Sequence, residues 1–211
     1  MVSRITLAIA LLLSSPGAWA LDFTPIVPTH ESPRMRRFPR LLFKDGARSV
    51  SYVRPAGWQF SGSAAGLRLE ANDPSHSIAT IQEVARKAPT PFDDQTIEAL
   101  KEGLLATLPA GSTNAKITRV EANPLRIDGH QTLELTVSYF ALALDRMQSV
   151  LFVNLPESQL QFALKALKAD FPTTHERFRR SYYTWQWLEQ GITTAVPPAS
   201  PPPESSARLS P

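Results

Sequence analysis

Cysteine is absent from this chain of 211 residues. That absence excludes disulfide bonds, thiolate zinc sites, a cysteine nucleophile and a lipid anchor on cysteine. An excess of one charge is also lacking, because 22 Lys and Arg face 19 Asp and Glu for a net charge of +3. The sequence has no Gly-x-Ser-x-Gly element, no phosphate-binding loop and no dinucleotide fingerprint. With 43% hydrophobic residues, the composition indicates a globular domain rather than a fibrous or disordered chain.

A hydrophobic run long enough to cross a membrane is missing from the first twenty residues. Arg4 precedes an apolar run from Ile5 to Leu13, and the segment ends in Ala18-Trp19-Ala20. A transmembrane helix needs about 20 apolar residues, whereas a basic start, a short apolar run and an Ala-x-Ala end are typical of a signal peptide. We therefore predict a signal peptide over residues 1–20, cleavage near Ala20, and a periplasmic or secreted protein without a transmembrane segment.

Prolines gather near both ends of the chain that cleavage would leave. Four lie within residues 21–40 and six within residues 191–211. Proline has no N–H group for a helix or sheet, and these segments contain few apolar groups to bury. We predict a Pro/Arg-rich flexible arm over 21–40, a folded domain over 41–190 and a disordered Pro-rich tail over 191–211. The tail is either a passive spacer or a ligand for a proline-binding domain.

Alternating polarity predicts the strands of the domain. Residues 132–139 alternate without a break, which predicts a strand with Leu133, Leu135, Val137 and Tyr139 on one buried face. Residues 159–165 and 67–70 repeat the pattern. Residues 149–153 are apolar on both sides, as in a central strand covered on both faces.

Two Asp-Gly pairs predict hairpin turns, because glycine tolerates the backbone of a tight reversal. The pair Asp45-Gly46 would join residues 41–43 to residues 49–54. The pair Asp128-Gly129 would join residues 125–127 to the strand that starts near residue 131.

Two segments have the period of a helix. In residues 94–108, Ile97, Leu100, Leu104 and Leu108 recur at spacings of three and four, after the acids Asp93 and Asp94. Gly103 costs this helix about 1 kcal/mol relative to alanine, which indicates either close contact with the sheet or simple tolerance.

The second helix is predicted to begin at Thr173 or Thr174, where Thr173-x-x-Glu176 fits a capping box. Its apolar side would comprise Phe178, Tyr182, Trp185 and Leu188. The order of hairpin, strands, helix, four strands and helix predicts an α+β fold, an antiparallel β-sheet with helices packed on it.

The segment Tyr52-Val53-Arg54-Pro55-Ala56-Gly57-Trp58 resembles the Tyr-x-x-Pro-x-Gly-Trp opening of the PsbP-like and DcrB-like family. The order of later elements is similar too, so the resemblance covers about residues 40–188. It implies the PsbP-like α/β/α sandwich, a fold shared with the Ran-binding release factor. It implies accessory or binding roles and no particular reaction. In physical terms, we expect Pro55 to end a strand, Gly57 to allow a bend and Trp58 to be buried at the sheet edge.

No constellation of catalytic or metal-binding residues emerges from the spacing. The four histidines stand singly along the chain. Asp73 with His76, or Asp128 with His130, would supply two metal ligands at most, and such pairs in polar turns are usually solvated. The acids Asp93 and Asp94 are better explained as helix-terminal residues than as an acid–base pair. We therefore predict no cofactor, no metal site and no enzymatic activity.

Four arginines, Arg34, Arg36, Arg37 and Arg40, give the arm a basic cluster beside Met35 and Phe38. Their guanidinium groups would dock on an acidic protein surface or an anionic lipid surface. The alternative is a solubilising arm without a partner. Nucleic acid is not expected, because the domain over 41–190 is neutral and the chain is predicted to be exported.

Three hypotheses about function follow. The first is an exported, non-enzymatic accessory protein that docks on a protein partner through the arginine arm or an exposed face of the domain. The second is a small-molecule or metal-ion binding protein of the cell envelope. The third is an unrecognised hydrolase, for which no nucleophile and base occur at a telling spacing.

Overall fold

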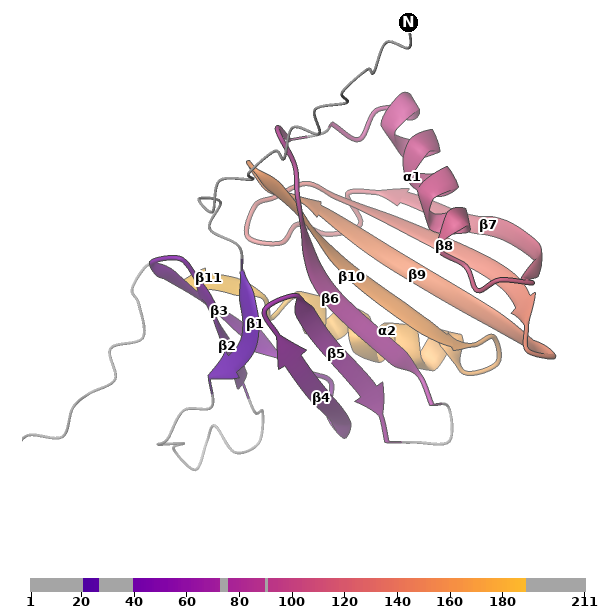
Figure 1. Ribbon diagram of the computed structural model, residues 1–211, viewed down its shortest axis with the longest axis horizontal. Helices are drawn as coiled ribbons and strands as arrows, with labels where there is room; N and C mark the ends of the chain where they lie inside the picture. Colours follow the sequence, from indigo (N-terminus) through magenta and orange to yellow (C-terminus); the bar gives the residue numbers. More distant parts are fainter. Residues whose placement is uncertain (1–20, 27–39, 73–75, 90, 189–211) are drawn as a thin grey trace, which may run out of the picture.

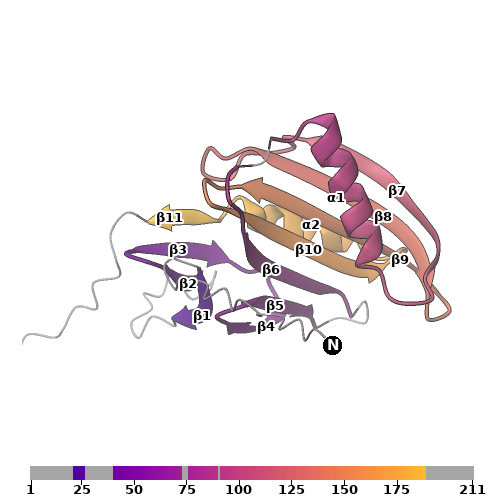
Figure 2. The same ribbon diagram turned by 45° about the horizontal axis from the view of Figure 1, so that its top comes forward.

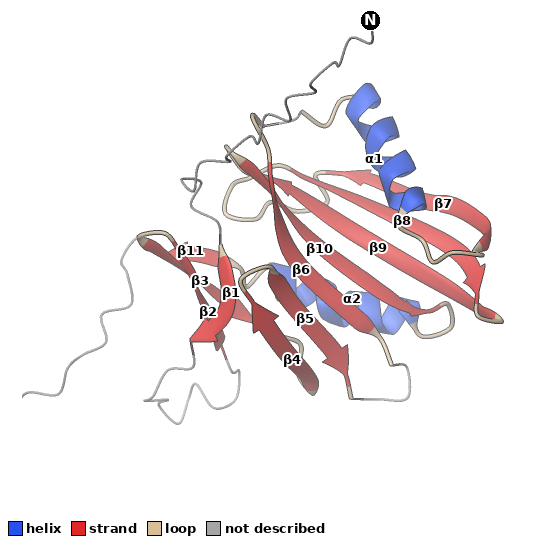
Figure 3. Cartoon of the chain, viewed as in Figure 1, coloured by secondary structure: helices blue, strands red, loops and turns tan. Residues whose placement is uncertain are grey.

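The computed structural model describes residues 21–26, 40–72, 76–89 and 91–188 (Figure 1). The helices in this part are α1 (Asp94–Ala106) and α2 (Phe171–Tyr182). The strands are β1 (Asp22–Ile26), β2 (Arg40–Asp45), β3 (Arg48–Val53), β4 (Trp58–Ser63), β5 (Gly66–Ala71), β6 (Ile78–Ala85), β7 (Thr113–Ala122), β8 (Thr132–Ala141), β9 (Leu144–Asn154), β10 (Ser158–Leu167) and β11 (Gln186–Leu188). Figure 3 shows that strands make up much more of the fold than helices do.

Seven strands form one sheet in the order β4-β5-β6-β10-β9-β8-β7. All neighbouring strands in it are antiparallel. In Figures 1 and 2, α1 lies over one face of this sheet and α2 over the other. The predicted α+β class, an antiparallel sheet with helices packed on it, is therefore confirmed.

A second, four-stranded sheet has the order β1-β2-β3-β11. It unites the first and last described strands of the chain. Its aromatic side chains meet those that follow α2, with the rings of Phe23 and Phe43 centred 5.6 Å apart and those of Phe43 and Trp185 6.1 Å apart. The main core therefore lies where this second sheet, α2 and the large sheet converge.

A smaller core lies under α1. Leu104 of α1 packs with Leu133, Leu135 and Val137 of β8 and with Phe152 of β9. The predicted buried face of residues 132–139 is confirmed. The predicted burial of residues 149–153 on both sides is also confirmed, because β9 contributes side chains to both cores.

The hairpin predicted at Asp45-Gly46 is confirmed by the antiparallel pairing of β2 with β3. The prediction around Asp128-Gly129 is wrong in part. A turn is present there, with φ of 48° and 83°, but Ile127 forms only an isolated bridge with His130. The strand that precedes β8 and pairs with it is β7. The polarity pattern missed β7 because it is a largely exposed edge strand.

Helix α2 begins earlier than the sequence indicated. Its N-cap is Asp170, and Pro172 lies in the first turn, where a missing N–H group costs nothing. The capping box at Thr173 and Glu176 is therefore wrong. The helix ends at Tyr182, so Trp185 follows it.

Residues 21–26, which we assigned to the flexible arm, belong to the folded domain. They include β1, which pairs with β2, and Leu21 and Phe23 are buried. The carbonyl oxygen of Phe23 approaches Gly62 of β4 so closely that a Cβ there would lie 2.1 Å away. Glycine is needed at residue 62 for this contact. The predicted signal peptide, the rest of the arm (27–39) and the tail (191–211) lie outside the described residues.

Candidate functional site

A groove of about 700 Å³ lies between α1 and the large sheet. Strands β6, β9 and β10 form its floor, and α1 forms one wall. Leu104 is the only described residue of α1 that is buried, and Ile97 and Leu100 pack partly buried against the same core. The structure thus leaves part of the sheet uncovered beside the helix.

Helix α1 is held at its start as the sequence indicated. The Asp93 carboxylate accepts a hydrogen bond of 2.8 Å from the backbone N–H of Thr96. This hydrogen bond lowers the pKa of Asp93, because it favours the ionised form. The interpretation of Asp93 as a helix-terminal residue is confirmed.

Gly103 faces the groove and does not touch the sheet. A Cβ at this position would meet no described atom of another element within 4 Å. Close contact with the sheet is therefore not the reason for glycine here. Its missing side chain instead widens the groove.

The floor contains a row of hydrogen-bonded glutamine amides. Nε2 of Gln82 on β6 donates to Oε1 of Gln161 on β10 at 3.0 Å. Nε2 of Gln161 then donates to Oε1 of Gln159 at 3.0 Å. Nη2 of Arg86 donates to that same oxygen at 3.2 Å. The row therefore ends at a cation.

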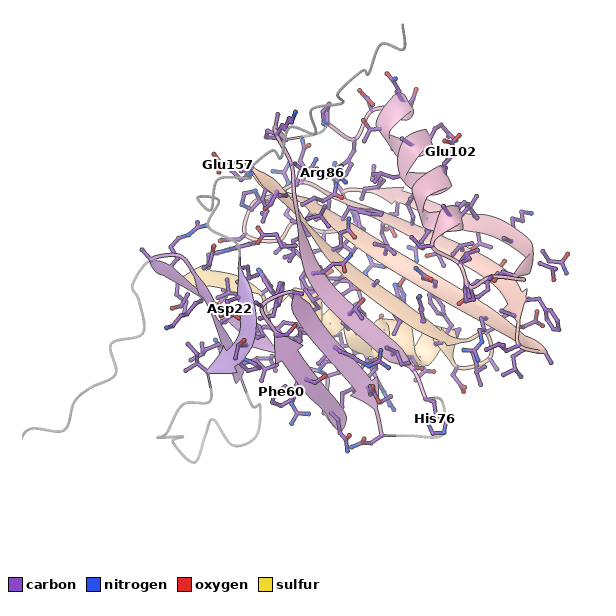
Figure 4. The ribbon with its side chains drawn as sticks, in the orientation of Figure 1. Asp22, Phe60, His76, Arg86, Glu102 and Glu157 are labelled. Carbon is purple, nitrogen blue, oxygen red and sulfur yellow. The ribbon has the colours of Figure 1, made fainter. Side chains whose placement is uncertain are left out.

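Arg86 lies where β6 ends, near the turn that contains Glu157 (Figure 4). Its backbone N–H donates to the carbonyl oxygen of Glu157 at 2.9 Å. Lys165 lies six residues from Gln159 along β10, about 20 Å away in an extended strand. Both cations line the groove, so positive charge is present at both ends of its floor.

Gln148 on β9 is, with Gln159, one of two buried polar residues of the described floor. Its register partner on β10 is Lys165. Only 3% of Gln148 is exposed, and its Oε1 has no hydrogen-bond partner among the described residues. Apolar side chains, Val150 and Phe152, lie further along β9 on the same floor. Phe152 is the register partner of Gln161, so the floor combines apolar side chains on β9 with polar side chains on β10.

The described lining of the groove contains no Asp, Glu or His. General acid–base chemistry uses such groups within hydrogen-bond reach of the reacting atoms. The described lining instead offers amides, hydroxyl groups and two cations.

Of the predicted arginine site, the structure describes Arg40, which is not among the residues that line the groove. Arg34, Arg36 and Arg37 lie outside the described residues. Arg40 is the first residue of β2 and is exposed, and its Nη1 donates to Oγ of Ser51 at 2.9 Å. Arg40 therefore belongs to the second sheet.

The histidines of the two candidate metal pairs, His76 and His130, also do not line the groove. His76 lies at the opposite end of β6 from Arg86 (Figure 4), and Asp73 is outside the described residues. His130 packs edge-on against Trp187, with ring centroids 5.7 Å apart. In the described part of the chain, no three His, Asp or Glu side chains gather in a way that could hold a metal ion.

The Tyr52–Trp58 segment is structural, as its physical interpretation indicated. Gly57 has a φ of 79°, and Trp58 at the start of edge strand β4 stacks on Phe178 of α2 with centroids 6.0 Å apart. Tyr52 is fully buried, and its hydroxyl group lies 2.8 Å from Oγ of Ser181. Burial raises the pKa of Tyr52 well above its usual range.

Sequence reasoning did not identify the groove, although one signal was present. Gln159, Gln161 and Lys165 are the polar positions of a strand that the alternation predicted. Such residues on the inner strand β10 of a helix-covered sheet indicate a polar surface inside the fold. Among the described residues, no helix has the length and apolar character to span a membrane.

Comparison with known proteins bears on the fold alone. No protein-family model matches the sequence, and no curated protein matches it. A similar solved structure is that of cyanobacterial PsbP from Synechocystis sp. PCC 6803, with 15% identity and a TM-score of 0.46 over 66% of this chain and 86% of that one. The chain resembles PsbP-like proteins in its fold.

Two further solved structures are similar to this chain. A protein of unknown function from Pseudomonas aeruginosa has 21% identity and a TM-score of 0.45, covering 66% of this chain and 96% of that one. LpqN of Mycobacterium tuberculosis, involved in cell envelope biogenesis, has 16% identity and a TM-score of 0.47, covering 80% of this chain and 91% of that one. The name of none of these three proteins describes an enzyme.

Proposed function

We propose that the chain is an exported, non-enzymatic binding protein of the cell envelope whose groove beside α1 holds a small polar ligand. The observation that carries this proposal is the buried Gln148 oxygen without a donor. A buried acceptor that is left unpaired costs about 1–3 kcal/mol. A ligand N–H or O–H group at this position would remove that cost.

The rest of the lining limits the chemistry of the ligand. Lys165 and Arg86 favour a carboxylate, a phosphate or another acceptor-rich group at one or both ends. Val150 and Phe152 favour a ligand that also has an apolar portion. The volume of about 700 Å³ matches pockets that bind small molecules, which span roughly 300–1,000 Å³.

Two observations support the remaining parts of the proposal. The described lining offers recognition groups but no carboxylate or imidazole for proton transfer. Export is supported by the basic start, the short apolar run and the Ala-x-Ala end of residues 1–20.

Thermal-shift screening of the mature chain against amino acids, dicarboxylates and sugar phosphates tests the proposal. A ligand at 100 times its Kd stabilises the fold by about 2.7 kcal/mol. We expect Gln148→Leu to weaken the shift and Gly103→Trp, which fills the groove, to abolish it. Ala106→Trp is the matched control, because Ala106 is an exposed residue of α1 outside the lining. A shift that persists in Gly103→Trp would place the ligand elsewhere.

Docking on a protein partner is the second candidate. The exposed Arg40 at the start of β2 favours it, because Arg34, Arg36 and Arg37 precede it directly in the sequence. Affinity capture from an envelope extract, with the chain and a variant in which all four arginines are alanine, tests this candidate. A protein that only the unchanged chain retains would support docking through the arm. Equal retention would assign any contact to the domain.

A further inference from the structure

The first residue of the predicted mature chain contacts a carboxylate of the large sheet. The backbone nitrogen of Leu21 donates a hydrogen bond of 2.8 Å to Oε2 of Glu83 on β6. The other carboxylate oxygen of Glu83 accepts a hydrogen bond of 2.5 Å from Oγ of Ser158. Leu21 is only 3% exposed and belongs to the main core. Glu83 therefore holds the start of β1 against the end of the large sheet.

Among the described residues, the Glu83 carboxylate has no cationic side chain as a partner. Arg48 lines the same hollow as Glu83, but its guanidinium group pairs with Asp45 at 2.8 Å. A half-buried carboxylate that accepts hydrogen bonds only from neutral donors is less well stabilised than a carboxylate beside a cation. A positive charge on the Leu21 nitrogen would complete this site.

The sequence provides the means to create that charge, because Leu21 directly follows Ala18-Trp19-Ala20. We propose that a signal peptidase hydrolyses the Ala20–Leu21 bond and that the resulting α-ammonium group of Leu21 forms an ion pair with Glu83. Water supplies the oxygen of the new Ala20 carboxylate, and the Leu21 nitrogen takes up protons. A free α-amino group has a pKa of about 8, so it is mostly charged at neutral pH. This proposal does not depend on the groove.

The fold also sets the order of events. The Leu21 and Phe23 side chains are buried in the core. A peptidase needs the residues on both sides of the cleaved bond to be accessible. Cleavage must therefore precede the pairing of β1 with β2, and the new ammonium group then fixes β1 in place. Processing and completion of the four-stranded sheet are thus coupled.

A double-mutant cycle tests the ion pair. One chain begins at Leu21 with a free amino group, and the other begins at Ala18, which keeps the Leu21 nitrogen as an amide. Each is prepared with and without Glu83→Gln, and the melting temperatures are compared. A charge-assisted hydrogen bond is roughly twice as strong as a neutral one. We expect the Leu21 chain to melt about 2–4 °C above the Ala18 chain, and we expect Glu83→Gln to remove that difference.

Two measurements guard against a purely structural effect. Acetylation of the Leu21 amine keeps an N–H donor but removes the charge. It should lower the melting temperature by the same 2–4 °C, which corresponds to about 1 kcal/mol. Glu157→Gln is the control, because Glu157 is an exposed carboxylate at the same end of the sheet (Figure 4) and should change both chains alike. Equal losses from Glu83→Gln in both chains would overturn the ion pair. A host-purified protein whose mass places its first residue elsewhere would overturn the cleavage site.

Discussion

Nε2 of His175 on α2 lies 2.5 Å from Oε1 of Glu134 on β8. Glu134 is completely buried, and its Oε2 has no partner among the described residues. Phe171 stacks on the imidazole ring of His175 with centroids 5.0 Å apart. This contact fastens α2 to the large sheet on the face opposite α1.

Breaking this pair from one side should be costly. His175→Leu leaves the Glu134 carboxylate buried without a donor, and we expect a loss of about 3–5 kcal/mol in the free energy of unfolding. The double variant Glu134→Leu/His175→Leu should lose much less, because neither polar group remains. Urea denaturation measures both, with the exposed His76→Leu as control. A double variant as unstable as the sum of the two single variants would contradict this account.

Alanine at two glycines should change stability in opposite directions. In Gly62→Ala the new Cβ would lie 2.1 Å from the Phe23 carbonyl oxygen, so β1 must shift, and we expect a loss of about 1–3 kcal/mol. In Gly103→Ala the Cβ has free space, and the helix should gain about 1 kcal/mol. Melting temperatures of the two variants and the unchanged chain measure both effects. A Gly62→Ala protein as stable as the unchanged one would refute the close approach of β1 to β4.

The turn between β8 and β9 should improve with a different sequence. Leu142 and Ala143 both have positive φ, 53° and 60°, which costs non-glycine residues about 1–2 kcal/mol each. Leu142 is 82% exposed, so replacing it loses no core contact. We expect Leu142→Asn with Ala143→Gly to raise the melting temperature by about 2–4 °C. In the turn at Asp128-Gly129, Gly129→Ala should lower the melting temperature, because Gly129 has a φ of 83°. A lower melting temperature for Leu142→Asn with Ala143→Gly would contradict the positive φ angles of the β8–β9 turn.

Buried tyrosines should make the fold sensitive to alkali. Burial raises the pKa of Tyr52, and burial together with the nearby Glu134 carboxylate raises that of Tyr182. In the unfolded chain both would ionise near pH 10, so the unfolded state loses protons first. The stability from these groups is complete below about pH 10 and falls as the pH rises further.

Absorbance at 295 nm and far-UV circular dichroism, followed together, check this prediction. We expect the phenolate signals of Tyr52 and Tyr182 to arise only with the loss of secondary structure. In denaturant, all four tyrosines should titrate near pH 10. Early ionisation of Tyr52 or Tyr182 in a chain that is still folded, identified with Tyr→Phe variants, would show that these side chains are not enclosed.

Local pattern was sufficient for several elements. The alternation over residues 132–139 identified β8 and its buried face, and the acids before Ile97 identified the start of α1. Period and capping act within a few residues, so they can be recognised in the sequence alone. The edge strand β7 has no such local pattern, because its positions are mostly exposed and do not need to alternate in polarity. It was therefore missed.

The candidate site and the start of the chain depended on distant partners. Gln82 and Gln161 are 79 residues apart in sequence, and they meet only because β6 pairs with β10. Leu21 and Glu83 are 62 residues apart. The sequence alone determined the α+β class, the main strands and helices and the expected processing point. The tertiary structure alone decided the groove, the second sheet and the hydrogen bond between Leu21 and Glu83, because polarity specifies which face of a strand is buried but not which strand lies beside it.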